Sequence, residues 1–169
     1  MGSKSKKEKA KKRAKKQRIR TLALGIFWDK GRILVNKSYD SAKQQYFYRA
    51  LGGSIEYGET GAQALVREIK EELNAEIANA RYLFTLENIF EYEGEIGHEI
   101  VLFYDATFID ETLYDREVLH GVEDCGEPIV AMWKSLDEFE RTDSSEGGLI
   151  LYPADYLEAL KGIYKAPYV

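Results

Sequence analysis

The segment that decides the fold lies in the first half of the chain, where residues 53 to 75 read GSIEYGETGAQALVREIKEELNA. A glycine-containing loop runs here into an amphipathic pattern. Thr60 and Gln63 have the spacing of a capping box, in which each side chain satisfies a backbone N–H at the start of a helix. Asn74 follows the last apolar position, where a helix often ends in a left-handed residue. The pattern therefore predicts a helix from about Thr60 to Asn74.

Three carboxylates share one side of this predicted helix. Glu68, Glu71 and Glu72 are spaced i, i+3 and i+4, so at 100° per residue they fall within a wedge of roughly 100°. The apolar residues are expected to point away from this wedge and toward a core; they are Ala62, Leu65, Val66, Ile69 and Leu73. The sequence therefore predicts one apolar stripe for packing and a separate acidic stripe for chemistry.

Such crowding of carboxylates calls for a compensating cation, because like charges at i, i+4 oppose each other by about 0.2–0.5 kcal/mol per pair. Arg67 can relieve part of this repulsion. Hard divalent cations, Mg²⁺ or Mn²⁺, are the usual reason for such a cluster of oxygen ligands, whereas a lone Glu-x-x-Glu-Glu is more often a solvated surface. The longer pattern favours a metal site, because it fixes six residues at set spacings: Gly53, Glu59, Arg67, Glu68, Glu71 and Glu72.

At these six positions the chain resembles the Nudix hydrolases, whose motif is Gly-x5-Glu-x7-Arg-Glu-apolar-x-Glu-Glu-x-Gly-apolar. The sequence departs from the motif at Asn74, where the family has Gly, and at Ala75, where it has a larger aliphatic residue. Neither departure removes a ligand. The resemblance extends more loosely over most of residues 19 to 163.

The resemblance implies a metal-dependent pyrophosphohydrolase that cleaves the diphosphate bond of a nucleoside diphosphate linked to another group. A nucleoside triphosphate, a dinucleoside polyphosphate and a nucleotide sugar are all such substrates. Mg²⁺ or Mn²⁺ would be held by Glu59, Glu68, Glu71 and Glu72.

The same resemblance gives roles to further residues. Arg67 would orient Glu68, and the proton of the attacking water would pass to Glu68 or to a later loop glutamate, Glu127, with Glu123 as second choice. Gly52 and Gly53 would let the backbone approach the substrate or the metal. Tyr92 lies at about the place where dinucleoside polyphosphate hydrolases carry a tyrosine, so it is a candidate substrate-binding residue.

The rest of the body alternates between strand and helix patterns, which predicts the α/β class, arranged as an α/β/α sandwich around a mixed β-sheet. We expect a hairpin of residues 21–28 and 32–35, a strand at 45–51 before the motif, and a pair of long strands at 80–92 and 99–108. An acidic connection at 110–127 should follow, then a late strand at 129–133 that leads into a short helix, and a last helix at 153–163.

Composition favours a single domain. The chain has 169 residues, of which 44% are hydrophobic and 31% charged. No apolar run approaches the roughly 18 residues of a membrane span, and the N-terminus lacks the apolar stretch of a secretory signal. A single Cys125 cannot form an intramolecular disulfide, which fits a reducing compartment. We therefore expect a cytoplasmic protein without a membrane span.

Charge divides the chain into two parts. Residues 1 to 20 contain eleven Lys or Arg and one acid, Glu8, so the remaining 149 residues carry 13 basic and 28 acidic side chains and sum to −15. The domains are therefore predicted as a basic, disordered tail at residues 1–18 and a Nudix hydrolase domain at residues 19–169. The tail fits attraction to RNA, DNA or anionic lipid, but a solubilising tail or a flap over the acidic body is the slightly favoured interpretation.

Two further functions stay open beside hydrolysis of a nucleotide-type small molecule. The tail could recruit a triphosphorylated or capped RNA, which would make the protein an RNA 5′-end pyrophosphohydrolase. A non-catalytic nucleotide-sensing module is the other alternative. The sequence is also compatible with a homodimer.

Overall fold

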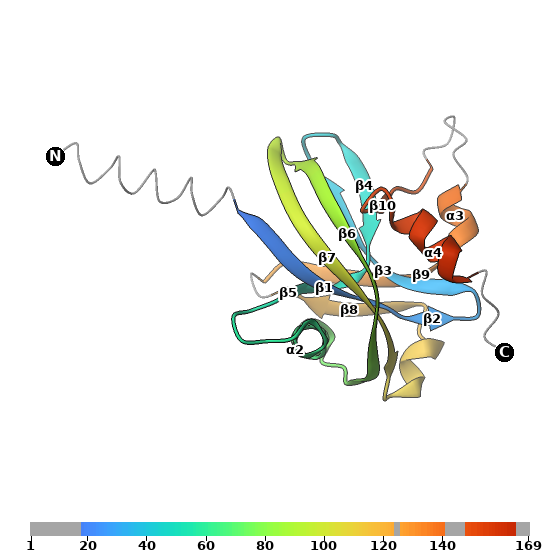
Figure 1. Cartoon of the computed structure of the whole chain (residues 1–169). Coiled ribbons are helices and arrows are strands. Elements are labelled where there is room, and N and C mark those ends of the chain that lie inside the picture. The colour runs from blue at the N-terminus through green and yellow to red at the C-terminus, as the bar shows by residue number, and fades with distance from the viewer. Residues whose placement is uncertain (1–17, 124–125, 141–147, 165–169) are drawn as a thin grey trace.

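The computed structural model describes residues 18–123, 126–140 and 148–164, and two β-sheets form the centre of the described chain (Figure 1). Sheet A has the strand order β5-β1-β7-β6. Strand β1 runs parallel to β7, whereas the other pairs are antiparallel, so the sheet is mixed. Its strands are β1 (Ile19–Ile26), β5 (Leu51–Ser54), β6 (Ile77–Tyr92) and β7 (Glu95–Phe108).

Sheet B is also mixed, because β10 pairs parallel with β4 while the other pairs are antiparallel. Its strand order is β10-β4-β3-β9-β8, and β2 pairs with β3 off this path. The strands are β2 (Trp28–Asp29), β3 (Arg32–Asp40), β4 (Gln45–Arg49), β8 (Val118–Val122), β9 (Pro128–Ser135) and β10 (Leu151–Tyr152).

Helices lie on both sides of the sheets (Figure 1). Helix α2 (Gly61–Leu73) contacts β1, β5, β6 and β8, whereas α3 (Leu136–Glu140) contacts β9 and α4 (Tyr156–Tyr164) contacts β10. A short 3₁₀ helix, η1 (Glu111–Asp115), precedes β8. The predicted α/β class is confirmed, with two mixed sheets in place of one. No helix in the described part of the chain is long and apolar enough to cross a membrane.

From Leu22 onward, strand β1 is buried on both faces and therefore joins two apolar clusters. Leu22, Leu24 and Ile26 pack into the cluster that contains Tyr156 of α4. Ala23 points the other way, into the cluster that contains Leu65 of α2. A strand covered on both faces reads as a continuous apolar run, which is why this segment was recognisable from its sequence.

The predicted hairpins are only partly correct. Lys30 and Gly31, both with positive φ, form the turn of the first one, but this turn joins β3 to the short β2, while β1 leaves to pair with β5 and β7. The long pair is confirmed as β6 and β7, with the turn at Glu93 and Gly94.

The predictions for the C-terminal part need two corrections. The expected acidic connection at residues 110–127 contains η1 and a strand, β8, which pairs with β9. The last helix begins at Tyr156, three residues after the predicted start at Pro153. The predicted basic tail, apart from Arg18, and Cys125 lie outside the described residues.

Candidate active site

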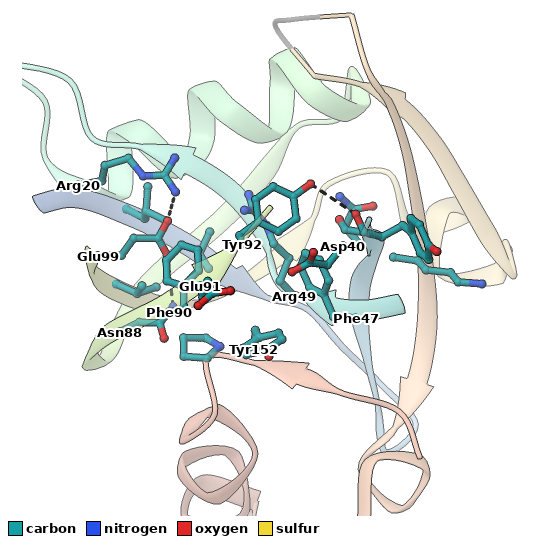
Figure 2. Close-up of a pocket in the computed structure, with 18 of the residues that line it drawn as sticks. Arg20, Asp40, Phe47, Arg49, Asn88, Phe90, Glu91, Tyr92, Glu99 and Tyr152 are labelled. Carbon is teal, nitrogen blue, oxygen red and sulfur yellow. Dashed lines mark hydrogen bonds and ion pairs between the residues drawn. The ribbon is translucent and has the colours of Figure 1, made fainter. Parts of the chain in front are cut away.

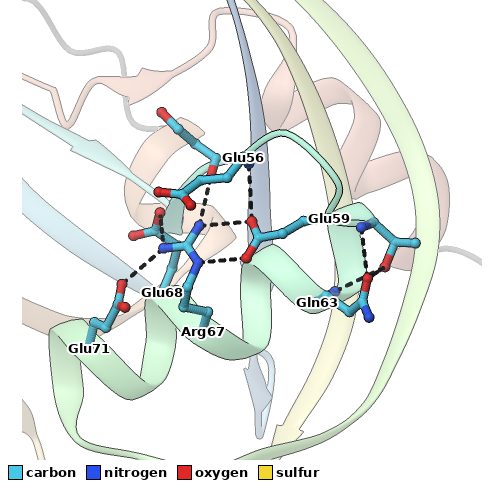
Figure 3. A network of polar contacts seen from close by, with 8 residues as sticks. Glu56, Glu59, Gln63, Arg67, Glu68 and Glu71 are labelled. Atoms are coloured by element: carbon cyan, nitrogen blue, oxygen red, sulfur yellow. Dashed lines mark hydrogen bonds and ion pairs between the residues drawn. The ribbon is translucent and has the colours of Figure 1, made fainter.

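Helix α2 begins and ends where the sequence predicts. Thr60 has an extended conformation with φ −80° and ψ 158°, and its side chain accepts a hydrogen bond from the Gln63 N–H at 3.3 Å. The Gln63 side chain accepts in return from the Thr60 N–H at 2.9 Å, which completes the capping box (Figure 3). Asn74 ends the helix in the left-handed conformation with φ 49°. Both ends of the helix are therefore set by local hydrogen bonding.

The predicted separation of an apolar and an acidic stripe is wrong. Val66 is 44% exposed, whereas Glu72 is only 6% exposed and lies on the same face as the fully buried Leu65 and Ile69. Glu72 follows Leu65 by seven residues and Ile69 by three, so it returns to the face that packs on the sheets. The helix therefore places carboxylates within its packing face.

Arg67 holds the other carboxylates together (Figure 3). Its Nε and Nη2 donate to the two oxygens of Glu59 at 2.8 and 3.0 Å. Its Nη1 donates to Glu68 at 3.0 Å and to Glu71 at 2.9 Å, and its Nη2 also donates to the backbone oxygen of Ser54 at 2.9 Å. Hydrogen bonding to Glu59, with smaller effects of Glu68 and Glu71, raises the pKa of Arg67, and the same contact lowers the pKa of Glu59. Arg67 thus ties the loop, the end of β5 and α2 into one unit.

Gly52 and Gly53 lie directly against two of the carboxylates. The Gly52 N–H donates to Glu72 Oε2 at 3.3 Å. A Cβ atom on Gly53 would lie 2.5 Å from both carboxylate oxygens of Glu68. Gly52 has φ +119°, and a Cβ there would collide with the backbone oxygen of Ala23. Strand β5 can therefore lie this close to β1 and to α2 only because both positions lack a side chain.

Glu72 is an acid in an unfavourable environment for its charge. Burial is the main cause that raises its pKa to about 7, and the negative charges of Glu123 and Glu68 add to this effect. Arg49 and the Gly52 N–H act in the opposite direction. A cation beside Glu72 would remove the electrostatic cost of ionising it.

The donor chemistry of the cluster fits a hard divalent cation, because every candidate side chain offers only oxygen. In the described part of the chain, no three Asp, Glu, His or Cys side chains converge closely enough to enclose a metal ion. Glu68 and Glu71 are instead ion-paired with Arg67 at 3.0 and 2.9 Å. A metal ion would therefore have to compete with Arg67 for these two carboxylates.

A cleft of about 810 Å³ opens between the two sheets (Figure 2), and the motif glutamates are not among the residues that line it. Its lining includes Arg49 and Glu123, two of the three residues whose charges act on Glu72. Tyr92 also lines the cleft, as expected of a substrate-binding residue, and its ring meets Phe47 edge-on with centroids 5.9 Å apart. Tyr152 meets Phe47 in the same way at 5.5 Å. We call Phe47, Tyr92 and Tyr152 the aromatic cluster of the cleft.

The structure brings both loop glutamates to the cleft. Glu123 and Glu127 both line it, and the Glu123 N–H donates to the Glu127 backbone oxygen at 2.8 Å where β8 turns into β9. The charge of Glu123, the second choice from the sequence, acts on Glu72, whereas the charge of Glu127 acts on Tyr92. Of the two loop glutamates, Glu123 is therefore the one whose charge affects a carboxylate of the motif.

Sequence reasoning missed Arg49 as a residue of the site. It lies on β4, is partly buried, and faces the cleft beside Phe47, two positions away on the same strand. Alternation along the strand was the available signal, because residues two apart project from the same face.

Comparison with known proteins shows the family of this chain. The family model described as NUDIX domain matches residues 16–152. The chain belongs to the Nudix family. Members are pyrophosphohydrolases, so the predicted class of hydrolase, acting on phosphorus-containing acid anhydrides, is confirmed.

Two curated relatives are NAD-capped RNA hydrolases NudC from Pseudomonas aeruginosa, strains LESB58 and ATCC 15692. Each is 31% identical to this Nudix chain over 90 residues, which are 53% of this chain and 27% of the relative. The match thus spans about a quarter of the length of these relatives.

Solved structures share the Nudix fold at low sequence identity. A NUDIX hydrolase from Nitrosomonas europaea has a TM-score of 0.60 and 16% identity, with 88% of this chain and 90% of that chain covered. The E. coli ORF135 protein has a TM-score of 0.56 and 24% identity, with 90% and 96% covered. A UDP-X diphosphatase has a TM-score of 0.55 and 14% identity, with 98% and 72% covered. At these identities the likeness shows the fold alone.

The raised pKa of Glu72 predicts a pH-dependent stability in the absence of divalent cations. Its pKa is about 7 in the folded protein against an ordinary value of 4.5, so the folded state binds more protons between these values. The stabilisation that comes from protonated Glu72 is complete below pH 4.5 and is lost as the pH rises through 7. The free energy of unfolding should fall by on the order of 2–3 kcal/mol over this range.

Urea unfolding in EDTA at pH 5 and pH 8 measures this effect. Glu72→Gln removes the titrating group, so this variant should not lose that stability between pH 5 and pH 8. The free energy of unfolding of the variant minus that of the parent protein should therefore rise by the same amount from pH 5 to pH 8. A difference between the two proteins that does not change with pH would contradict the assignment.

Proposed function

We propose that the protein is a divalent-cation-dependent pyrophosphohydrolase that cleaves the diphosphate bond of a nucleoside diphosphate linked to another group. One observation carries the proposal: the buried carboxylate of Glu72 lies within the electrostatic range of Arg49 and Glu123, which line a nucleotide-sized cleft. Clefts of roughly 300–1,000 Å³ with aromatic walls and a few polar groups are the usual binding sites for small molecules.

Glu68, Glu71 and Glu72 are our metal ligands, with Mg²⁺ or Mn²⁺ as the ion. When bound, the ion supplies electrostatic stabilisation of the charge that develops on the phosphoryl oxygens. Glu59 was also predicted as a ligand. Because both of its oxygens accept from Arg67, we assign it a positioning role through Arg67.

The remaining groups of the site would bind the substrate. Gly52 and Gly53 bring the backbone of β5 against the carboxylates, since the Glu68 carboxylate occupies the place that a Cβ on Gly53 would take. Arg49 places a positive charge at the same end of the cleft, which suits a phosphate oxygen. The aromatic cluster offers a stacking surface, and Tyr92 contributes to it.

The first experiment is turnover of a panel of phosphate anhydrides with Mg²⁺ or Mn²⁺. It contains canonical and oxidised nucleoside triphosphates, ADP-ribose, diadenosine polyphosphates, nucleotide sugars and triphosphorylated RNA. Glu72→Gln should lower kcat by about 100-fold or more, because several kcal/mol of transition-state stabilisation depend on the metal ligands.

Glu76→Gln is the matched control. Glu76 lies four residues further along, is exposed and pairs only loosely with Lys70 at 3.4 Å. Its replacement should leave kcat within about twofold of the parent, since surface changes have small effects. Equal turnover of Glu72→Gln and the parent protein would overturn the proposal.

We also propose a residue for the general base. Glu68 accepts a hydrogen bond from Arg67, and the charge of Glu127 acts on Tyr92 rather than on Glu72. Because the charge of Glu123 does act on Glu72, we propose Glu123 as the general base. Glu123→Gln should lower kcat by about 10²–10⁴-fold, whereas Glu127→Gln should lower it much less. Measurement of kcat for both variants on the preferred substrate tests this order. The reverse result would return the role to Glu127, as the sequence suggested.

Action on an RNA 5′ end is a second candidate function. Residues 1 to 20 carry eleven Lys or Arg, and the curated relatives are NAD-capped RNA hydrolases. Lysine-rich segments bind phosphate backbones in a strongly salt-dependent way. In the panel, preference for RNA over free nucleotides, with turnover that falls steeply as salt is added, would favour this candidate.

A non-catalytic nucleotide sensor is favoured by the opposite outcome of the panel. Tight nucleotide binding without turnover of any member would support it. The complete set of motif glutamates argues against it, because binding alone does not require all of them.

A further inference from the structure

A charged row crosses sheet A where this sheet lines the cleft. Arg20 on β1 is the register partner of Glu99 on β7, and Glu99 is the register partner of Asn88 on β6. All three residues line the cleft, on the side of Figure 2 away from Arg49 and Asp40. The row is remote in sequence from the motif and has no role in the chemistry described above.

Glu99 is a buried charge that packing alone does not require. It is 6% exposed, and the next row of the same face is apolar, with Leu22 opposite Val101. Replacing a buried ion pair by apolar side chains is often neutral or stabilising. A carboxylate retained at this place therefore points to a ligand.

The polar groups of this row can still form hydrogen bonds with a ligand in the cleft. Arg20 Nη2 donates to Glu99 Oε1. Asn88 Nδ2 reaches Glu99 Oε2 only at 3.5 Å, the limit for a hydrogen bond. Within the described residues Arg20 donates to Glu99 alone, and its side chain is 43% exposed, so its guanidinium has further N–H donors to offer a ligand.

We infer that this row recognises the edge of a guanine base, which makes Glu99 the specificity-determining residue. The inference rests on the proposed function, because it places the nucleoside of that substrate in the cleft. Guanine presents two adjacent N–H donors, N1 and N2, beside the acceptor O6. A carboxylate matches the two donors, the guanidinium matches O6, and the Asn88 amide oxygen can accept from N2.

Other bases satisfy the row less completely. Adenine and cytosine each offer one amino group beside a ring-nitrogen acceptor, so only one donor meets Glu99. Uracil offers a single N–H between two acceptors. A site that hydrogen-bonds a substrate N–H discriminates strongly against analogues that lack it, because its own polar groups are then left unpaired.

The rest of the cleft is arranged consistently with a guanine at this end. The aromatic cluster belongs largely to the opposite wall, where Phe47 on β4 and Tyr152 on β10 offer faces for stacking. Arg49, whose charge acts on Glu72 of α2, lines the cleft away from the row, where the phosphates would be (Figure 2). We therefore expect the base at the row and the phosphates toward Arg49.

Titration of the full chain with GMP and with AMP, followed by NMR, tests the inference without requiring turnover. The parent protein should bind GMP about 10- to 100-fold more tightly than AMP. Glu99→Gln, which replaces an acceptor by a donor, should abolish this preference and leave AMP affinity within about twofold. Asn88→Ala, which keeps the Arg20–Glu99 pair, should lower GMP affinity alone by about threefold or more.

Asp105→Asn is the matched control, because Asp105 on β7 also forms a cross-strand ion pair, here with Arg81 on β6 at 3.0 Å, and does not line the cleft. It should leave both affinities unchanged. Equal binding of GMP and AMP, absence of GMP binding, or an equal loss of both ligands in Glu99→Gln would overturn the inference. Failure of the proposed function would show separately, as absence of turnover across the substrate panel.

Discussion

The guanidinium of Arg67 is the contact on which the candidate active site depends. It donates to Glu59 in the loop, to the end of β5 at Ser54, and to Glu68 and Glu71 on α2. A lysine could not replace it, because its three donors radiate from a single atom and do not form a planar fork. Without this fork three carboxylates would repel one another, and the loop would lose its attachment to the helix.

Glu72 completes the site by a different physical route. Leu65 and Ile69 fix the face of α2 that packs on sheet A, and Glu72 shares this face, so it is carried into the interior by the same burial that stabilises the helix. Its charge is disfavoured there by burial and by two neighbouring carboxylates. A divalent cation would relieve both effects, which is the physical reason to expect metal binding at a place where packing alone would favour an apolar residue.

Local patterns predicted the ends of α2 well, because a capping box and a left-handed Asn act within a few residues. The orientation of the helix was mispredicted: a helical wheel gives the angles between residues, but contact with the sheets decides that Val66 faces solvent and Glu72 does not. Strand β8 was missed because it has only five residues, of which only Leu119 is buried, and it is held in place by pairing with β9. Arg20 and Glu99 are 79 residues apart and meet only through strand register, and the six positions of the motif carry no information about this pairing.

The most direct test of the metal site is anomalous diffraction from crystals grown with Mn²⁺. The account predicts a manganese ion bound by Glu68, Glu71 and Glu72, with Arg67 released from at least one of its two partners on α2. A manganese ion elsewhere on the chain, with every Arg67 contact intact, would contradict the assignment of the motif glutamates as metal ligands.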